Sequence, residues 1–116
     1  MMDGTPIEIE RITVDDGEVV EVRGELDLSN ARLLEDSLSE VESQMVILDL
    51  TNVEFIDSAG IRTVDRGRRS FAEVGRTLLI VAPPASRAAS IFRIAGFGDR
   101  FLLDSRDGAR SKQPEG

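Results

Sequence analysis

A serine and two aspartates stand where predicted strands give way to helices. Asp57 and Ser58 follow the apolar segment that ends at Ile56, and Asp27 follows the strand pattern that ends at Leu26. A hydroxyl at such a turn could cap the helix, attack a substrate or accept a phosphate. The two carboxylates could cap two helices, or could form an acidic rim around Ser58 at one edge of a sheet.

The composition argues against catalysis at this serine. The chain contains no histidine and no cysteine, which removes the usual base for a serine nucleophile, thiol chemistry and most transition-metal sites. The sequence Ile56–Gly60 around Ser58 does not match the G-x-S-x-G of a hydrolase nucleophile turn, and it has neither the glycines nor the lysine of a phosphate-binding loop. No third ligand accompanies Asp27 and Asp57. We therefore expect no enzyme activity, no metal and no cofactor, and Ser58 remains a candidate cap or phosphate acceptor.

Charge and hydropathy limit the partners. The net charge of −8 over 116 residues opposes direct binding to nucleic acid. No apolar segment approaches the roughly 20 residues of a membrane-spanning helix. We expect a cytoplasmic protein that does not insert into membranes and is a monomer when free. One basic strip stands out on the predicted helix after Ser58, either as an ordinary solvated face or as a partner surface; it contains Arg62, Arg66, Arg68 and Arg69.

The spacing of apolar residues predicts an α/β fold. Two alternating strands separated by Asp15-Asp16-Gly17 predict an opening antiparallel hairpin, and the later strand–helix–strand units predict parallel pairing. The sum is a single domain with a mixed sheet of about five strands and helices packed beside it. The predicted strands cover 7–12, 19–26, 46–50, 77–81 and 101–103, and the predicted helices cover 31–41, 58–74 and 88–95.

Several local features complete this prediction. Residues 46–50 read as a strand buried on both faces, followed by a polar bend at Thr51-Asn52. Gly75 and Gly96 are expected to end helices. The last short strand is expected at a sheet edge. Residues 1–6 are expected to be flexible, residues 7–104 to form the domain, and residues 105–116 to form a disordered tail.

Three segments together resemble a known family. Gly24-Glu25-Leu26-Asp27, the segment Val46–Val53 and the segment Phe55–Ile61, with its Asp-Ser-Ala-Gly turn, are similar to the STAS domain of bacterial anti-sigma factor antagonists. The resemblance covers residues 7–104. The Asp-Ser-Ala-Gly turn after a buried strand is its most specific part.

The resemblance implies a partner switch. Such an antagonist binds an anti-sigma factor with serine kinase activity and releases a sigma factor. It is switched off when the kinase phosphorylates the serine of the turn, here Ser58, and a phosphoserine phosphatase resets it. The same fold serves as a soluble accessory subunit of stress-signalling or membrane lipid-transport complexes, which is the alternative. The partner-binding residues implied by the resemblance and by the basic strip are Asp27, Asp57, Ser58, Ala59, Gly60, Ile61 and Arg62.

Overall fold

A computed structural model of the chain describes residues 7–15, 17–97 and 102–111. Strands and helices follow one another in the predicted order, with one further helix at the end. The strands are β1 (Ile7–Val14), β2 (Gly17–Leu26), β3 (Met45–Ile56), β4 (Thr77–Val81) and β5 (Leu102–Leu103). The helices are α1 (Ala31–Glu40), α2 (Ser58–Glu73), α3 (Arg87–Ile94) and α4 (Arg106–Ser111).

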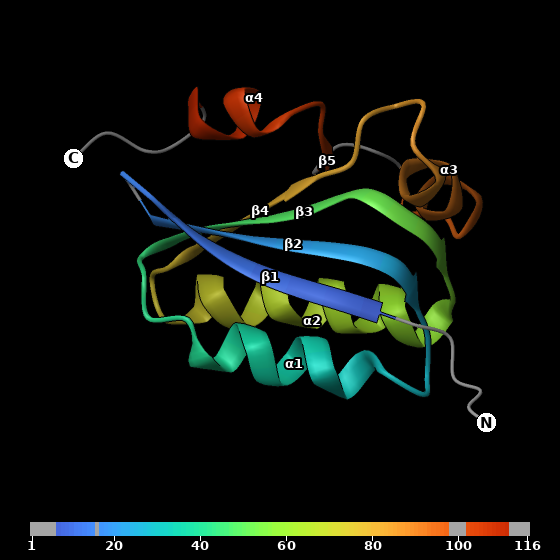
Figure 1. Cartoon of the computed structure of the whole chain (residues 1–116), viewed down its shortest axis with the longest axis horizontal. Helices are drawn as coiled ribbons and strands as arrows, with labels where there is room; N and C mark the ends of the chain where they lie inside the picture. The colour runs from blue at the N-terminus through green and yellow to red at the C-terminus, as the bar shows by residue number, and fades with distance from the viewer. Residues whose placement is uncertain (1–6, 16, 98–101, 112–116) are drawn as a thin grey trace.

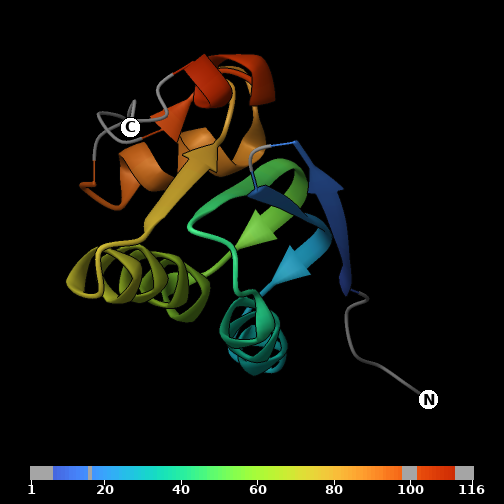
Figure 2. The same ribbon diagram turned by 90° about the vertical axis from the view of Figure 1, so that its left-hand side faces the viewer.

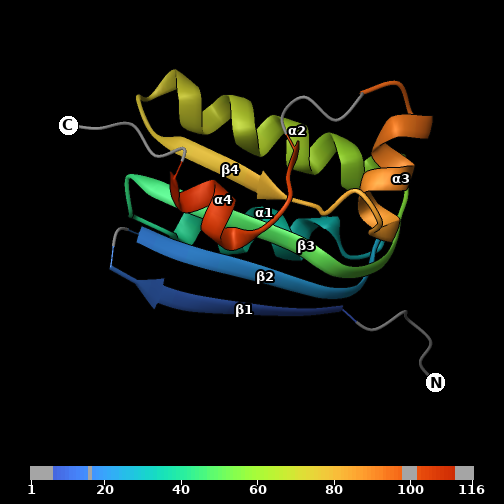
Figure 3. The same cartoon turned by 90° about the horizontal axis from the view of Figure 1, so that it is seen from above.

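The five strands form one mixed sheet in the order β1-β2-β3-β4-β5 (Figure 3). β1 and β2 pair antiparallel, and every later pair is parallel. The predicted hairpin and parallel units are therefore confirmed, and β5 lies at an edge as expected. Because β2 and β3 are parallel, the ends of both strands, at Leu26 and Ile56, lie side by side.

The helices cover both sides of the sheet (Figures 1 and 2). α1 and α2 lie together on one side, and α3 and α4 lie on the other. This arrangement explains why every residue from Met45 to Leu50 is buried, since a strand with helices on both faces has no side exposed to water. The apolar stripe of α1 is buried as predicted, and it consists of Ala31, Leu34, Leu38 and, just beyond the helix, Val41.

The prediction that the strand ends at Leu50 before a polar bend at Thr51-Asn52 is wrong. β3 continues through both residues as a strand of 12 residues. Its register with β2 shifts twice, between Glu21 and Arg23 and again between Gly24 and Glu25, and β3 contributes the additional residue each time. The polar pair is therefore accommodated by bulges within the ladder, which bend a strand without ending it.

Two other expectations concern helix ends and the tail. Gly75 and Gly96 follow α2 and α3 with φ angles of +78° and +90°, the left-handed conformation that glycine adopts most readily. The disordered tail is wrong over Arg106–Ser111, which forms α4. Ala109 is fully buried against the sheet, and the Arg106 side chain forms an ion pair with Asp49 at 2.6 Å. Residues 1–6, Phe101 and 112–116 lie outside the described residues.

Candidate functional site

Asp57, and not Ser58, caps α2. The Asp57 backbone is extended, and its Oδ1 accepts a hydrogen bond of 2.9 Å from the amide of Gly60. α2 begins at Ser58, whose side chain is exposed and forms no hydrogen bond with any described residue. The sequence left open whether this serine is a cap. In the structure the cap is Asp57.

The second oxygen of Asp57 joins two loops. Asp57 Oδ2 accepts a hydrogen bond of 3.1 Å from the amide of Leu28, and the amide of Asp57 donates to the carbonyl of Leu26 at 3.2 Å. The loop after β2 is thereby fixed beside the turn after β3. The expectation that Asp27 and Asp57 lie at one edge of the sheet is confirmed.

Asp27 organises its own loop and does not cap α1. Its Oδ1 accepts hydrogen bonds from the amide and the hydroxyl of Ser29, at 2.9 and 2.6 Å. The N-cap position of α1 belongs to Asn30, whose side chain instead bonds the amide of Asp27 and the carbonyl of Glu25. Asn30 is only 6% exposed. The segment Asp27–Asn30 was expected to offer capping side chains to the helix, but the Asn30 side chain instead closes the loop, as asparagine often does in turns.

The remaining residues of the turn divide between surface and interior. Ser58 and Arg62 are exposed and Ala59 is partly exposed, whereas Gly60 and Ile61 are buried. A Cβ at Gly60 would lie 2.7 Å from Cγ1 of Ile56 and 2.8 Å from the carbonyl oxygen of Leu26. Gly60 therefore allows α2 to pack directly on the ends of β2 and β3. Gly60 and Ile61 support the exposed surface from beneath.

Two large apolar side chains near the turn are exposed. Leu28, in the loop after β2, is 78% exposed, and Phe55, the last residue but one of β3, is 45% exposed. Leu28 and Ala59 also line a shallow groove of about 250 Å³ between the first turns of α1 and α2, together with Arg32 and Arg62. Leu28 and Arg32 were not predicted. An isolated leucine in a polar loop has no periodic pattern that would indicate its exposure.

The basic strip on α2 is mostly paired within the domain. Arg66 forms an ion pair with Glu35 of α1 at 2.7 Å, and the next two arginines both pair with Asp65, at 2.8 and 2.7 Å. Arg62 has no ion pair with any described residue. It lies four positions after Ser58, which is one helical turn. Arg62 is thus the arginine of this strip whose charge is available beside the serine.

Other kinds of site find little support in the described ranges. No group of three or more acidic side chains gathers there in a way that could hold a metal ion. Among the described helices, none has the length and apolarity required to cross a membrane. The region around Ser58 is an exposed surface in which the Ser58 hydroxyl has no hydrogen-bond partner among the described residues.

Comparisons with known proteins identify the family of the chain. The family model of the STAS domain matches residues 8–108, so the chain belongs to the STAS domain family. No curated protein matches the chain in a sequence comparison.

Solved structures that resemble the chain include anti-sigma factor antagonists. One from Mycobacterium paratuberculosis is 26% identical with a TM-score of 0.78, over 92% of this chain and 93% of the other. The phosphorylated form of the Bacillus cell fate determinant SpoIIAA is 18% identical with a TM-score of 0.67, over 92% and 98%. A sulfate transporter family protein from Wolinella succinogenes is 23% identical with a TM-score of 0.66, over 81% of each chain. The last two identities show the shared fold alone.

Proposed function

We propose that this STAS domain is an anti-sigma factor antagonist that works as a partner switch through Ser58. In its unphosphorylated form it binds an anti-sigma factor with serine kinase activity and so frees a sigma factor. Phosphorylation of Ser58 by that kinase ends the binding, and a phosphoserine phosphatase restores it. The domain acts in the cytoplasm as a monomer when free, binds protein and not nucleic acid, and catalyses no reaction itself.

The observation that carries this proposal is that the Ser58 hydroxyl is exposed and takes no part in capping α2, since Asp57 is the cap. Because Asp57 already accepts the bond from Gly60, the fold has no structural use for the serine oxygen. A hydroxyl at the first position of a helix is accessible to a kinase from the solvent side. The match to an anti-sigma factor antagonist over nine-tenths of both chains supports the same role.

The local electrostatics allow a phosphate at this position without refolding. A phosphoserine adds about −1.5 to −2 charges, and the N-terminus of a helix stabilises negative charge. Arg62, one turn further along α2, can pair with the phosphate because no described carboxylate engages it. The domain therefore tolerates the modification, and the effect must fall on whatever protein covers Ser58.

The surroundings of Ser58 fit a protein interface. Exposed Leu28 provides an apolar anchor beside Ala59, exposed Phe55 lies near the end of β3, and Arg32 and Arg62 provide charge at the groove. Interfaces concentrate their binding energy in a few such side chains near the centre. A phosphate placed among them is desolvated and repelled by partner carboxylates. A loss of about 3 kcal/mol in binding free energy corresponds to a roughly hundredfold weaker complex.

The test is affinity capture from a lysate of the source organism, with bound proteins identified by mass spectrometry. The baits are wild type, Ser58→Ala, Ser58→Glu and the control Ser70→Glu. Ser70 is also exposed on α2 but lies 12 positions away, about 18 Å along the helix. The Ser70→Glu variant therefore adds the same charge as Ser58→Glu to the same helix, but away from the proposed interface.

The proposal requires an anti-sigma factor with a kinase domain on wild type, Ser58→Ala and Ser70→Glu, and its absence from Ser58→Glu. Capture of the same transport or stress-complex subunits by all four baits would contradict it. That result would instead support an accessory subunit in which the Ser58 hydroxyl has no switching role.

A further inference from the structure

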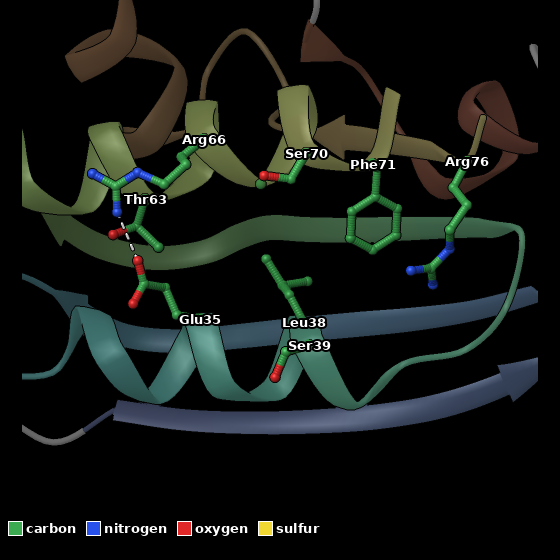
Figure 4. A pocket seen from close by; sticks show the side chains of 9 residues that line it. Glu35, Leu38, Ser39, Thr63, Arg66, Ser70, Phe71 and Arg76 are labelled. Carbon is green, nitrogen blue, oxygen red and sulfur yellow. Dashed lines mark hydrogen bonds and ion pairs between the residues drawn. The ribbon is translucent and has the colours of Figure 1, made fainter. Parts of the chain in front are cut away.

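A second hollow lies between α1 and α2, further along both helices than the turn at Ser58. Figure 4 shows its lining, with side chains from α1 on one side and from α2 on the other. Its volume is about 290 Å³, just below the roughly 300–1,000 Å³ of small-molecule pockets. Leu38 and Phe71 give it apolar walls, and Gly67 leaves part of its floor without a side chain. We call it the α1–α2 groove.

One end of this groove holds a fixed positive charge. The Arg76 guanidinium donates to the carbonyls of Val41 at 2.7 Å and Ser43 at 2.8 and 3.1 Å, and it lies 4.2 Å from the centre of the Phe71 ring. All of these partners are neutral. No carboxylate of the described part of the chain forms an ion pair with Arg76, in a protein of net charge −8.

The charged side chains at the other end of the groove are paired with each other. Glu35 and Arg66 form their ion pair of 2.7 Å there, on the side away from Arg76 (Figure 4). The acidic side chain that lines the groove is thus already neutralised. The groove has an apolar middle, an exposed serine hydroxyl from Ser70 and one uncompensated cation at its end.

We propose that the α1–α2 groove binds a small amphipathic carboxylate, with its carboxylate on Arg76 and its apolar body against Leu38 and Phe71. A guanidinium held by backbone carbonyls is already oriented, so little side-chain entropy is lost when it binds an anion. The limited volume and the one cation of its lining that is unpaired among the described residues suit such a molecule better than a nucleoside triphosphate, which is larger and carries several negative charges. The site adjoins the groove beside Ser58, with which it shares Glu35, Thr63 and Arg66, but its binding groups Leu38, Phe71 and Arg76 line the α1–α2 groove alone.

Octanoate is a suitable probe, with octanamide as its uncharged counterpart. Each is titrated to millimolar concentrations into ¹⁵N-labelled full-length protein, and amide shifts are followed by NMR. We expect saturable shifts for octanoate that concentrate on residues 35–39, 67–71 and 76, and affinity at least tenfold weaker for octanamide. This comparison requires no mutation.

Three variants refine the test. Arg76→Gln removes the cation and should weaken octanoate binding at least tenfold. Ser70→Phe places a ring over the groove from an exposed position, so it should abolish binding while the protein stays folded. Arg87→Gln removes an exposed arginine at the start of α3, on the other side of the sheet, and should leave binding unchanged.

Three results would overturn the proposal. One is equal binding of octanoate and octanamide, since it would remove the role of the charge. Another is a set of shifts centred elsewhere or unaltered by Ser70→Phe. The third is the absence of saturable shifts at millimolar octanoate in folded wild-type protein.

Discussion

Gly60 offers a direct test of how α2 is seated on the sheet. In Gly60→Ala the new Cβ would lie 2.7 Å from Cγ1 of Ile56, and 2.8 and 3.0 Å from the carbonyl oxygen and Cγ of Leu26. The Leu26 carbonyl also accepts the hydrogen bond from the amide of Asp57. Relief of the overlap must therefore move backbone at the turn itself.

The magnitude follows from these contacts. Overpacking a core position costs about 1–3 kcal/mol, and a weakened backbone hydrogen bond adds about 1 kcal/mol. The higher helix propensity of alanine offsets up to about 1 kcal/mol. We expect the free energy of unfolding of Gly60→Ala to fall by about 1–3 kcal/mol relative to wild type.

Gly67→Ala is the matched control in the same helix. Its Cβ would lie 3.1 Å from Cδ1 of Leu38 and 3.4 Å from Cδ2 of Leu78, which are the movable ends of side chains. Here helix propensity should dominate, so stability should be unchanged or higher by up to about 1 kcal/mol. Urea denaturation of both variants measures the contrast. Equal stabilities for the two variants would refute the claim that Gly60 is required by packing.

Three further predictions concern the carboxylates and the serine. Asp57→Ala should lower the free energy of unfolding by about 1–2 kcal/mol because the cap of α2 is lost. Asp57→Asn should lower it much less, because asparagine is also a good N-cap residue. Equal losses of the two variants in urea denaturation would contradict this. Burial disfavours ionisation of Asp49, but hydrogen bonds from Thr51 and Arg106 outweigh it and hold the pKa of Asp49 below its ordinary value. The resulting stability is present above the unfolded pKa of about 3.9 and is lost as pH falls through the lower folded value, so the stability difference between wild type and Asp49→Asn should shrink below about pH 4; a constant difference in acid titrations followed by circular dichroism would count against it. Phosphorylation of Ser58 should shift NMR signals of the first turn of α2 and of the Asp27 loop only, and changes throughout α2 would show a remodelled helix.

The periodic parts of the sequence predicted the fold well. The alternation in β1, which slips once at Arg11, and the apolar stripe of α1 each follow from side chains that pack against the core, so local spacing carries the information. The buried strand over 46–50 could also be predicted, because a strand covered by helices on both faces has a nearly continuous apolar sequence. The Asp-Ser-Ala-Gly turn also lies where it was predicted, at the end of a strand that pairs in parallel with its neighbour.

What local spacing could not show depends on long-range contacts. α4 contains one buried apolar side chain, Ala109, and is tied to the sheet by Arg106 and Asp49, which are 57 positions apart. Because only one of its side chains is apolar, this polar segment was predicted from sequence to be a disordered tail. The exposure of Leu28 depends likewise on the bond from its amide to Asp57, 29 positions later.

The central claim is tested most directly by the affinity of the captured anti-sigma factor for two forms of this protein, measured by calorimetry. One form is unmodified, and the other carries a phosphate on Ser58 verified by mass spectrometry. The partner switch predicts tight binding of the unmodified form and at least a roughly hundredfold weaker complex after phosphorylation, a difference of about 3 kcal/mol. Equal affinities of the two forms would contradict it.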